Sequence, residues 1–130
     1  MNSKYVVDTM AVVLRLEKRK LGRKVKAIFD EAEKGRATLF VPAMVLAEIG
    51  YLSERNKIDT NLKEVKDYCL KYPTVQVEAI TEETIHKSFE IDDIPELHDR
   101  IIAGTARLKN LELITNDPRI IDSKFVSTIW

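Results

Sequence analysis

The chain has 130 residues, 45% of them hydrophobic, and its 21 basic side chains balance 21 acidic ones, which predicts one globular domain, residues 1–130, around one core. Its single cysteine, Cys69, excludes an internal disulfide, and its longest uncharged apolar stretch, residues 39–47, is far shorter than the about 20 residues of a membrane-spanning helix. Because residues 1–8 also lack the apolar region of a signal peptide, we expect a cytoplasmic protein with no membrane partner.

The first half of the chain alternates short β-rich runs with helical stretches. Residues 4–8 form the first predicted strand, and helical material follows over about 11–34, with a break near Gly22 and an end at Gly35. Residues 37–41 form the second strand. Pro42 then suits the first turn of a helix that continues to about Glu54.

The second half continues this alternation. Helices are predicted at residues 59–72, 81–90 and 96–108, the second of which opens with a capping-box pattern, and strands at 75–80, 111–115 and 125–129. Strands that alternate with helices predict a parallel α/β sheet. Such sheets place their sites at the carboxyl ends of the strands, near a switch in strand order.

Two predicted strands run into an acidic residue. Asp8 follows the first strand and Asp117 follows the fourth. Each has a structural explanation when taken alone, because Asp8 suits a helix N-cap, a role that Thr9 could also fill, and Asp117 suits a turn leading into Pro118.

Two predicted helices each carry a further carboxylate. Glu48 is the only charged residue in residues 39–52 and has apolar neighbours one helical turn away, so its burial would require a partner. Asp99 opens an apolar helix, where the helix dipole alone would favour it. One hypothesis covers all four acids: the fold brings them to one crevice, where a cation neutralises their repulsion.

Ligands that are all oxygen, without a His/Cys cluster, favour Mg²⁺ or Mn²⁺ over zinc, and such ions activate water and offset charge on a phosphoryl group. The predicted ligands of one or two ions are Asp8, Glu48, Asp99 and Asp117. Glu48 alternatively positions the attacking water. Reserve ligands, or a merely negative rim, are Asp92, Asp93 and Glu96.

Over its whole length the chain resembles a PIN-domain ribonuclease, particularly the VapC-type toxins of toxin–antitoxin modules. The stretches that carry the resemblance are VVDTMAVV, VPAMVLAEIGYL, HDRIIAGTA and LITND, and the four acids match the family's acids in order. Met10 departs from the pattern, because many relatives have Ser or Asn there. Polar residues beside the matching acids, which would position them, are Thr9, Thr115 and Asn116.

This resemblance implies a PIN-like fold with a five-stranded parallel sheet, RNA cleavage that leaves a 5′-phosphate, a homodimer and a small antitoxin partner. The leading function is therefore a metal-dependent endoribonuclease that acts as a toxin. The alternatives are an RNA-processing nuclease outside a toxin–antitoxin module, and a PIN domain that binds RNA or a partner without cutting. A receiver domain would need an Asp at the end of the strand at 75–80, and a haloacid-dehalogenase-type phosphatase would need a second Asp at Met10.

Two runs of like charge complete the pattern. Residues 15–26 hold seven Lys/Arg against one acid and could track the RNA backbone, through Arg15, Lys18, Arg19, Lys20, Arg23 and Lys24. Residues 82–99 hold seven Asp/Glu against one Lys, which suits a metal ion. Both runs can also be solvated helix faces. Near the second run, His98 is a candidate base or a turn-orienting residue, and Arg100 would pair with an acid or touch phosphate.

Overall fold

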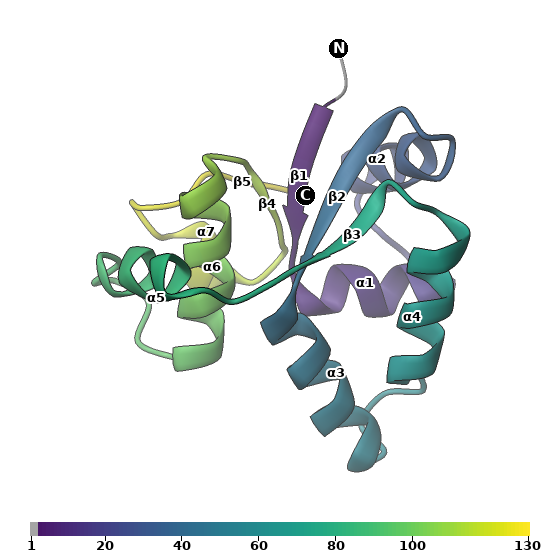
Figure 1. Ribbon diagram of the computed structural model, residues 1–130, viewed down its shortest axis with the longest axis horizontal. Helices are drawn as coiled ribbons and strands as arrows, with labels where there is room; N and C mark the ends of the chain where they lie inside the picture. Colours follow the sequence, from purple (N-terminus) through teal and green to yellow (C-terminus); the bar gives the residue numbers. More distant parts are fainter. Residues whose placement is uncertain (1–2) are drawn as a thin grey trace.

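The computed structural model describes residues 3–130 and contains a five-stranded sheet in the order β3-β2-β1-β4-β5, in which every pair of neighbours is parallel (Figure 1). The strands are β1 (Ser3–Val7), β2 (Ala37–Pro42), β3 (Val75–Glu78), β4 (Leu113–Ile114) and β5 (Thr128–Ile129). The helices are α1 (Thr9–Leu16), α2 (Arg23–Glu33), α3 (Ala43–Glu54), α4 (Leu62–Lys71), α5 (Glu82–Phe89), α6 (Leu97–Lys109) and α7 (Pro118–Ile121). The predicted five-stranded parallel α/β sheet is confirmed.

The strand order reverses at the central strand. β1 pairs with β2 on one side and with β4 on the other, so the chain first builds one half of the sheet and then crosses to build the second. In Figure 1, α5, α6 and α7 gather on one side of the strands and α2 and α4 on the other, while α1 and α3 begin where β1 and β2 end. The switch in strand order therefore places a crevice at the carboxyl ends of β1 and β4.

The strands β1 and β4 lie in the core. Val6, Val7, Leu113 and Ile114 are fully buried, as expected for parallel strands that are covered on both faces. Within residues 3–130, no helix combines the length and the apolar character that crossing a membrane requires.

Several boundaries differ from the prediction. The predicted strands at 111–115 and 125–129 have two residues each in the structure, where β4 pairs with the last two residues of β1 and with β5. Pro42 ends β2 and forms the N-cap of α3, so it precedes the first turn. The four-residue helix α7 was not predicted, since a single turn has no apolar periodicity.

Helices α5 and α6 pack closely through a glycine. A Cβ atom built on Gly104 would lie 1.9 Å from the hydroxyl oxygen and 2.8 Å from the Cα of Ser88. Ser88 is fully buried, and its hydroxyl donates to the carbonyl oxygen of Thr84. A side chain at position 104 would therefore push the two helices apart, and Asp99 begins the same helix α6.

We expect Gly104→Ala to lower the free energy of unfolding by about 1–3 kcal/mol, the usual cost of overpacking, as measured by urea denaturation. Gly50→Ala on α3 is the matched control, because its Cβ would lie 3.2 Å from the end of the flexible Leu62 side chain. That variant should gain roughly 0.5–1 kcal/mol of helix propensity or stay neutral. Equal stability of both variants would show that the α5–α6 contact tolerates a methyl group.

Candidate functional site

Asp8 sits where β1 leaves the sheet. The pairing of Val7 with Ile114 places Asp8 beside Thr115, and the Asp8 backbone N–H donates to the Ile114 carbonyl at 3.0 Å. The Thr115 hydroxyl donates to one carboxylate oxygen of Asp8, and the Thr9 N–H donates to the other, each at 2.6 Å. Asp8 is thus the N-cap of α1 and also a buried carboxylate at the crevice. Burial raises its pKa, although these hydrogen bonds oppose the rise.

Glu48 reaches the same place from α3. The hydroxyl of Thr9 donates to Glu48 Oε1 at 2.6 Å, which links the first residue of α1 to the middle of α3. Burial raises the pKa of Glu48, and the negative charge of Asp8 adds to the rise. The predicted need of this carboxylate for a partner is therefore met by Thr9, the first residue of α1.

Asp99 lies in the first turn of α6 and is not its cap. The cap is Glu96, whose Oε2 accepts the Asp99 backbone N–H at 2.7 Å. The side-chain oxygen Oδ2 of Asp99 is buried and has no hydrogen-bond partner. Burial raises the pKa of Asp99 to about 6, with further contributions from the charges of Glu96, Asp117 and Asp8.

Asp117 follows β4 as the N-cap of α7, where its N–H donates to the Thr115 hydroxyl at 3.1 Å. The guanidinium of Arg119 lies 3.2 Å from Asp117 Oδ2 and 3.6 Å from Asp99 Oδ2. Arg119 therefore offsets charge between two of the acids, and the sequence analysis missed it. The available signal was its position two residues after an acid that follows a strand, next to Pro118.

A hollow of about 310 Å³, here called the carboxylate cleft, collects these groups. It is lined by Asp8, Thr9, Met10, Glu48, Leu52, Asp99, Asn116, Asp117, Pro118 and Arg119. The structure thus brings together all four predicted acids, with Thr9, Asn116 and the hydrogen-bonded Thr115 beside them. Their roles in metal binding and catalysis stay predictions.

The acidic run at residues 82–99 was expected to suit a metal ion, but Asp99 is its only acid among the residues that line the carboxylate cleft. Asp93 accepts hydrogen bonds from the Ser123 hydroxyl and the Lys124 N–H, and neither it nor the exposed Asp92 lines the cleft. The carboxylate of Glu96 accepts the backbone N–H of Asp99, and its other oxygen lies 2.7 Å from the ring nitrogen Nδ1 of His98. His98 thus contacts the residue that caps α6.

Arg100 contacts neither an acid nor the cleft. Its Nε donates to the Ile94 carbonyl at 2.7 Å, and its guanidinium lies over the Phe89 ring. Both predicted alternatives for Arg100 are therefore replaced by a structural role that holds the loop before α6.

Arg15, a predicted RNA contact, lies in a cluster of ion pairs between helices. Its guanidinium bonds to Glu33 at 2.9 Å and to Asp30 at 2.8 Å, and only 18% of its side chain is exposed. The Tyr68 hydroxyl donates to the same Glu33. These contacts join α1, α2 and α4, and the bonds to Glu33 raise the pKa of Arg15. Arg15 is thus a link between helices.

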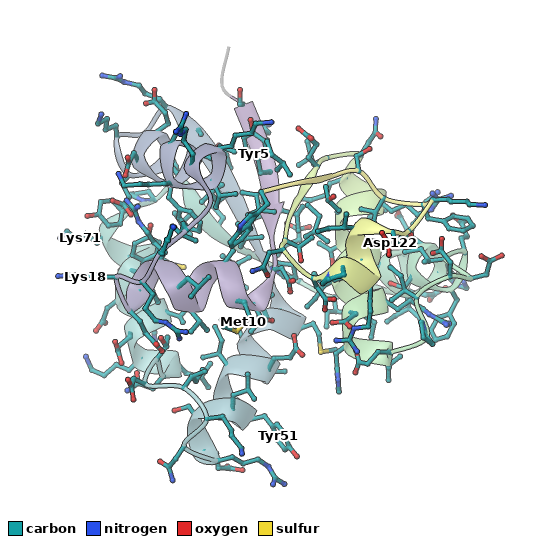
Figure 2. The ribbon with its side chains drawn as sticks, turned by 180° about the vertical axis from the view of Figure 1, so that it is seen from behind. Tyr5, Met10, Lys18, Tyr51, Lys71 and Asp122 are labelled. Atoms are coloured by element: carbon teal, nitrogen blue, oxygen red, sulfur yellow. The ribbon has the colours of Figure 1, made fainter. Side chains whose placement is uncertain are left out.

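The other five predicted basic residues are exposed and form what we call the basic surface: Lys18, Arg19, Lys20, Arg23 and Lys24. Figure 2 shows Met10 and Lys18 at opposite ends of α1, so the basic surface and the carboxylate cleft are separated by the length of that helix. Lys71 of α4, which the sequence analysis did not select, lines the same hollow as Lys18 and extends on the same side.

The fit of a divalent metal ion depends on the free oxygen atoms. No three of the described His, Cys, Asp or Glu side chains form a group that could hold an ion as they stand. Both oxygens of Asp8 and one of Glu48 are occupied by hydrogen bonds, whereas the buried Oδ2 of Asp99 is unpartnered. An ion that keeps several waters and takes one or two carboxylates suits this donor set.

Comparison with known proteins identifies the family. The profile of the PIN domain matches residues 5–125, and the chain therefore belongs to the PIN domain family. A search of curated proteins gave no significant match.

Three solved structures show the same fold. VapBC2 from Rickettsia felis, bound to a promoter DNA fragment, is 18% identical over 98% of both chains, with a TM-score of 0.74. DNA-bound VapBC from Salmonella typhimurium is 14% identical over 98% of this chain and 97% of that one, with a TM-score of 0.70. A toxin–antitoxin complex from Klebsiella pneumoniae is 17% identical over 97% and 96%, with a TM-score of 0.65. At these identities, the similarity establishes the fold.

The raised pKa of Asp99 predicts a pH-dependent stability in EDTA. Its unfolded pKa is near 3.8 and its folded pKa about 6, so between these values the folded state holds more protons and loses stability as pH rises. Asp99→Asn removes this carboxyl group, so the variant should be free of the loss. We therefore expect its stability relative to the wild type (the free energy of unfolding of the variant minus that of the wild type) to increase by up to about 3 kcal/mol between pH 3.5 and pH 7, as measured by urea denaturation.

Asp93→Asn is the matched control for this measurement. Hydrogen bonds from the Lys124 N–H and the Ser123 hydroxyl lower the pKa of Asp93, so its carboxylate stabilises the fold once ionised. The corresponding difference for Asp93→Asn should therefore fall as pH rises. A flat difference for Asp99→Asn would show that its carboxylate ionises without hindrance in the folded protein.

Proposed function

We propose that this chain is an Mg²⁺- or Mn²⁺-dependent endoribonuclease and the toxin of a type II toxin–antitoxin module. The observation that carries the proposal is the carboxylate cleft. Four acids, from the end of β1, α3, α6 and the turn after β4, meet in one hollow at the switch in strand order. The buried Asp99 Oδ2 accepts no hydrogen bond from the described residues. Membership of the PIN domain family supports a nuclease at this position.

The acids that would hold the metal are Asp8, Glu48, Asp99 and Asp117. A bound divalent ion would supply a Lewis acid for the phosphodiester and lower the pKa of a water nucleophile. Thr9 and Thr115 donate to Glu48 and Asp8, and so hold one oxygen of each carboxylate in a fixed direction. Thr115 also accepts from the Asp117 N–H, so one hydroxyl positions two of the acids.

Arg119 would contribute to phosphate binding in the same cleft. Its side chain is 67% exposed and ends beside Asp99 and Asp117, so it borders both the acids and solvent. A guanidinium there offers paired N–H donors that match phosphate oxygens.

The basic surface would bind the RNA backbone at a distance from the cut. Three of its residues, Lys18, Arg19 and Lys20, line one hollow with Lys71 beyond the end of α1, a helix of eight residues and about 12 Å in length that begins at the carboxylate cleft. Phosphates bound there would add affinity that falls with rising salt.

The direct test is cleavage of single-stranded RNA. The wild type should cut with Mg²⁺ or Mn²⁺ and leave 5′-phosphate ends, and EDTA should stop the reaction. Asp8→Asn and Asp99→Asn should each lower kcat by about 100-fold or more, because each loses one fixed charge at the reacting centre. Asp93→Asn, an acid outside the cleft, should keep full activity. Full activity in EDTA would contradict the mechanism.

The proposed partners are a small antitoxin and a second copy of this chain. Support for the antitoxin comes from the solved structures of similar fold, which include a toxin–antitoxin complex. A cationic side chain from the antitoxin would be attracted to the four acids and compete with the metal.

Expression of the wild type without its partner should slow growth, and Asp99→Asn should relieve the effect while Asp93→Asn should not. Co-expression of the small protein encoded beside it should restore growth. Growth curves in several hosts measure this directly. A wild type that is harmless in all of them would favour an RNA-processing nuclease outside a toxin–antitoxin module.

A further inference from the structure

A second hollow adjoins the carboxylate cleft. It has a volume of about 580 Å³ and is lined by Ala47, Glu48, Tyr51, Leu52 and His98, and we call it the Tyr51 pocket. Glu48 and Leu52 line both hollows, so the two share a wall. A molecule that places one group among the carboxylates can therefore place its neighbouring group in the Tyr51 pocket.

The lining of the Tyr51 pocket suits a flat ring. Tyr51 projects outward from α3 and is 55% exposed (Figure 2). The guanidinium of Arg55 lies 4.5 Å from the centroid of the Tyr51 ring and covers one of its faces. Because the Nδ1 atom of His98 contacts Glu96, the opposite ring nitrogen, Nε2, is the atom that a ligand would meet. Alanine and leucine side chains complete an apolar surface.

We propose that the Tyr51 pocket binds the nucleobase of one of the two nucleotides that flank the cut, an inference that rests on the proposed function. The base stacks on Tyr51, and its edge meets His98. Every nucleobase has an aromatic face, so stacking supplies affinity for any base, whereas the hydrogen bond to His98 favours some bases over others. The shared wall keeps this base within one nucleotide of the carboxylates.

A nucleobase suits this hollow better than an acidic or basic ligand would. The carboxylate of Glu48 in the shared wall repels an anion, and the guanidinium over Tyr51 repels a cation. An uncharged aromatic ring meets neither obstacle and gains both the apolar contact and the stacking. The charged phosphate of the same nucleotide remains on the cleft side, beside Arg119.

The test is digestion of a random-sequence, single-stranded RNA pool in Mn²⁺, followed by sequencing of the product ends. The wild type should prefer certain bases at one position next to the cut. Tyr51→Ala should lose that preference and raise KM about tenfold, with a smaller effect on kcat, because base stacking contributes mainly to binding. Tyr51→Phe should retain the preference, and His98→Ala should change which bases are preferred.

Phe89→Ala is the matched control. Phe89 is 57% exposed and also lies under a guanidinium, that of Arg100 at 5.1 Å, but it lines neither hollow. The base preference and the KM of the Phe89→Ala variant should equal those of the wild type. Light scattering of Tyr51→Ala and the wild type shows whether the substitution changes the oligomeric state.

The outcomes separate this inference from the nuclease itself. Cleavage by Tyr51→Ala with an unchanged base preference would overturn the proposal that the Tyr51 pocket binds a nucleobase, while the proposed nuclease activity would stand. A lost dimer with an unchanged base preference would also overturn it, and would assign the hollow to contact between two copies. No cleavage by the wild type in Mn²⁺ would overturn both proposals.

Discussion

The pairing of Val7 with Ile114 is the constraint on which the site depends. Because β1 leaves the sheet one residue later, Asp8 arrives beside Thr115, and the turn after β4 brings Asp117 to the same edge. A shift of one residue in this pairing would turn Asp8 to the opposite face of the sheet. The short central strands therefore determine the geometry of the carboxylate cleft more directly than the helices do.

Two threonines keep the acids apart in this crowded space. Thr9 donates its N–H to the Asp8 carboxylate and its hydroxyl to the Glu48 carboxylate. The Thr115 hydroxyl donates to the Asp8 carboxylate and accepts from the backbone N–H of Asp117. The Oδ2 atom of Asp99 accepts no hydrogen bond from residues 3–130, and the guanidinium of Arg119 lies 3.6 Å from it. Burial and the surrounding charges therefore act on Asp99 with little relief, which accounts for its pKa of about 6.

The four acids could be predicted from the sequence because each interrupts or ends an apolar run. The role of Arg119 and the ion pairs of Arg15 could not be read from the sequence, because they depend on where long side chains reach across neighbouring elements. Asp93 was a reserve ligand by proximity in sequence, whereas its hydrogen bonds to the loop before β5 could not be read from a charge pattern. Local spacing in the sequence predicts which residues meet at a strand end. The roles of the surrounding charged residues depend on side-chain contacts between distant parts of the chain.

Helix α1 is held at both ends by contacts with other helices and loops. At its start Thr9 bonds to Glu48, and at its end Arg15 bonds to Glu33, while Glu17 accepts the backbone N–H groups of Asp59 and Thr60. The helix is thus a rigid spacer between the carboxylate cleft and the basic surface. Any strand of nucleic acid that touched both would have to span its eight residues, so the protein itself would set a minimum length for a fully bound substrate.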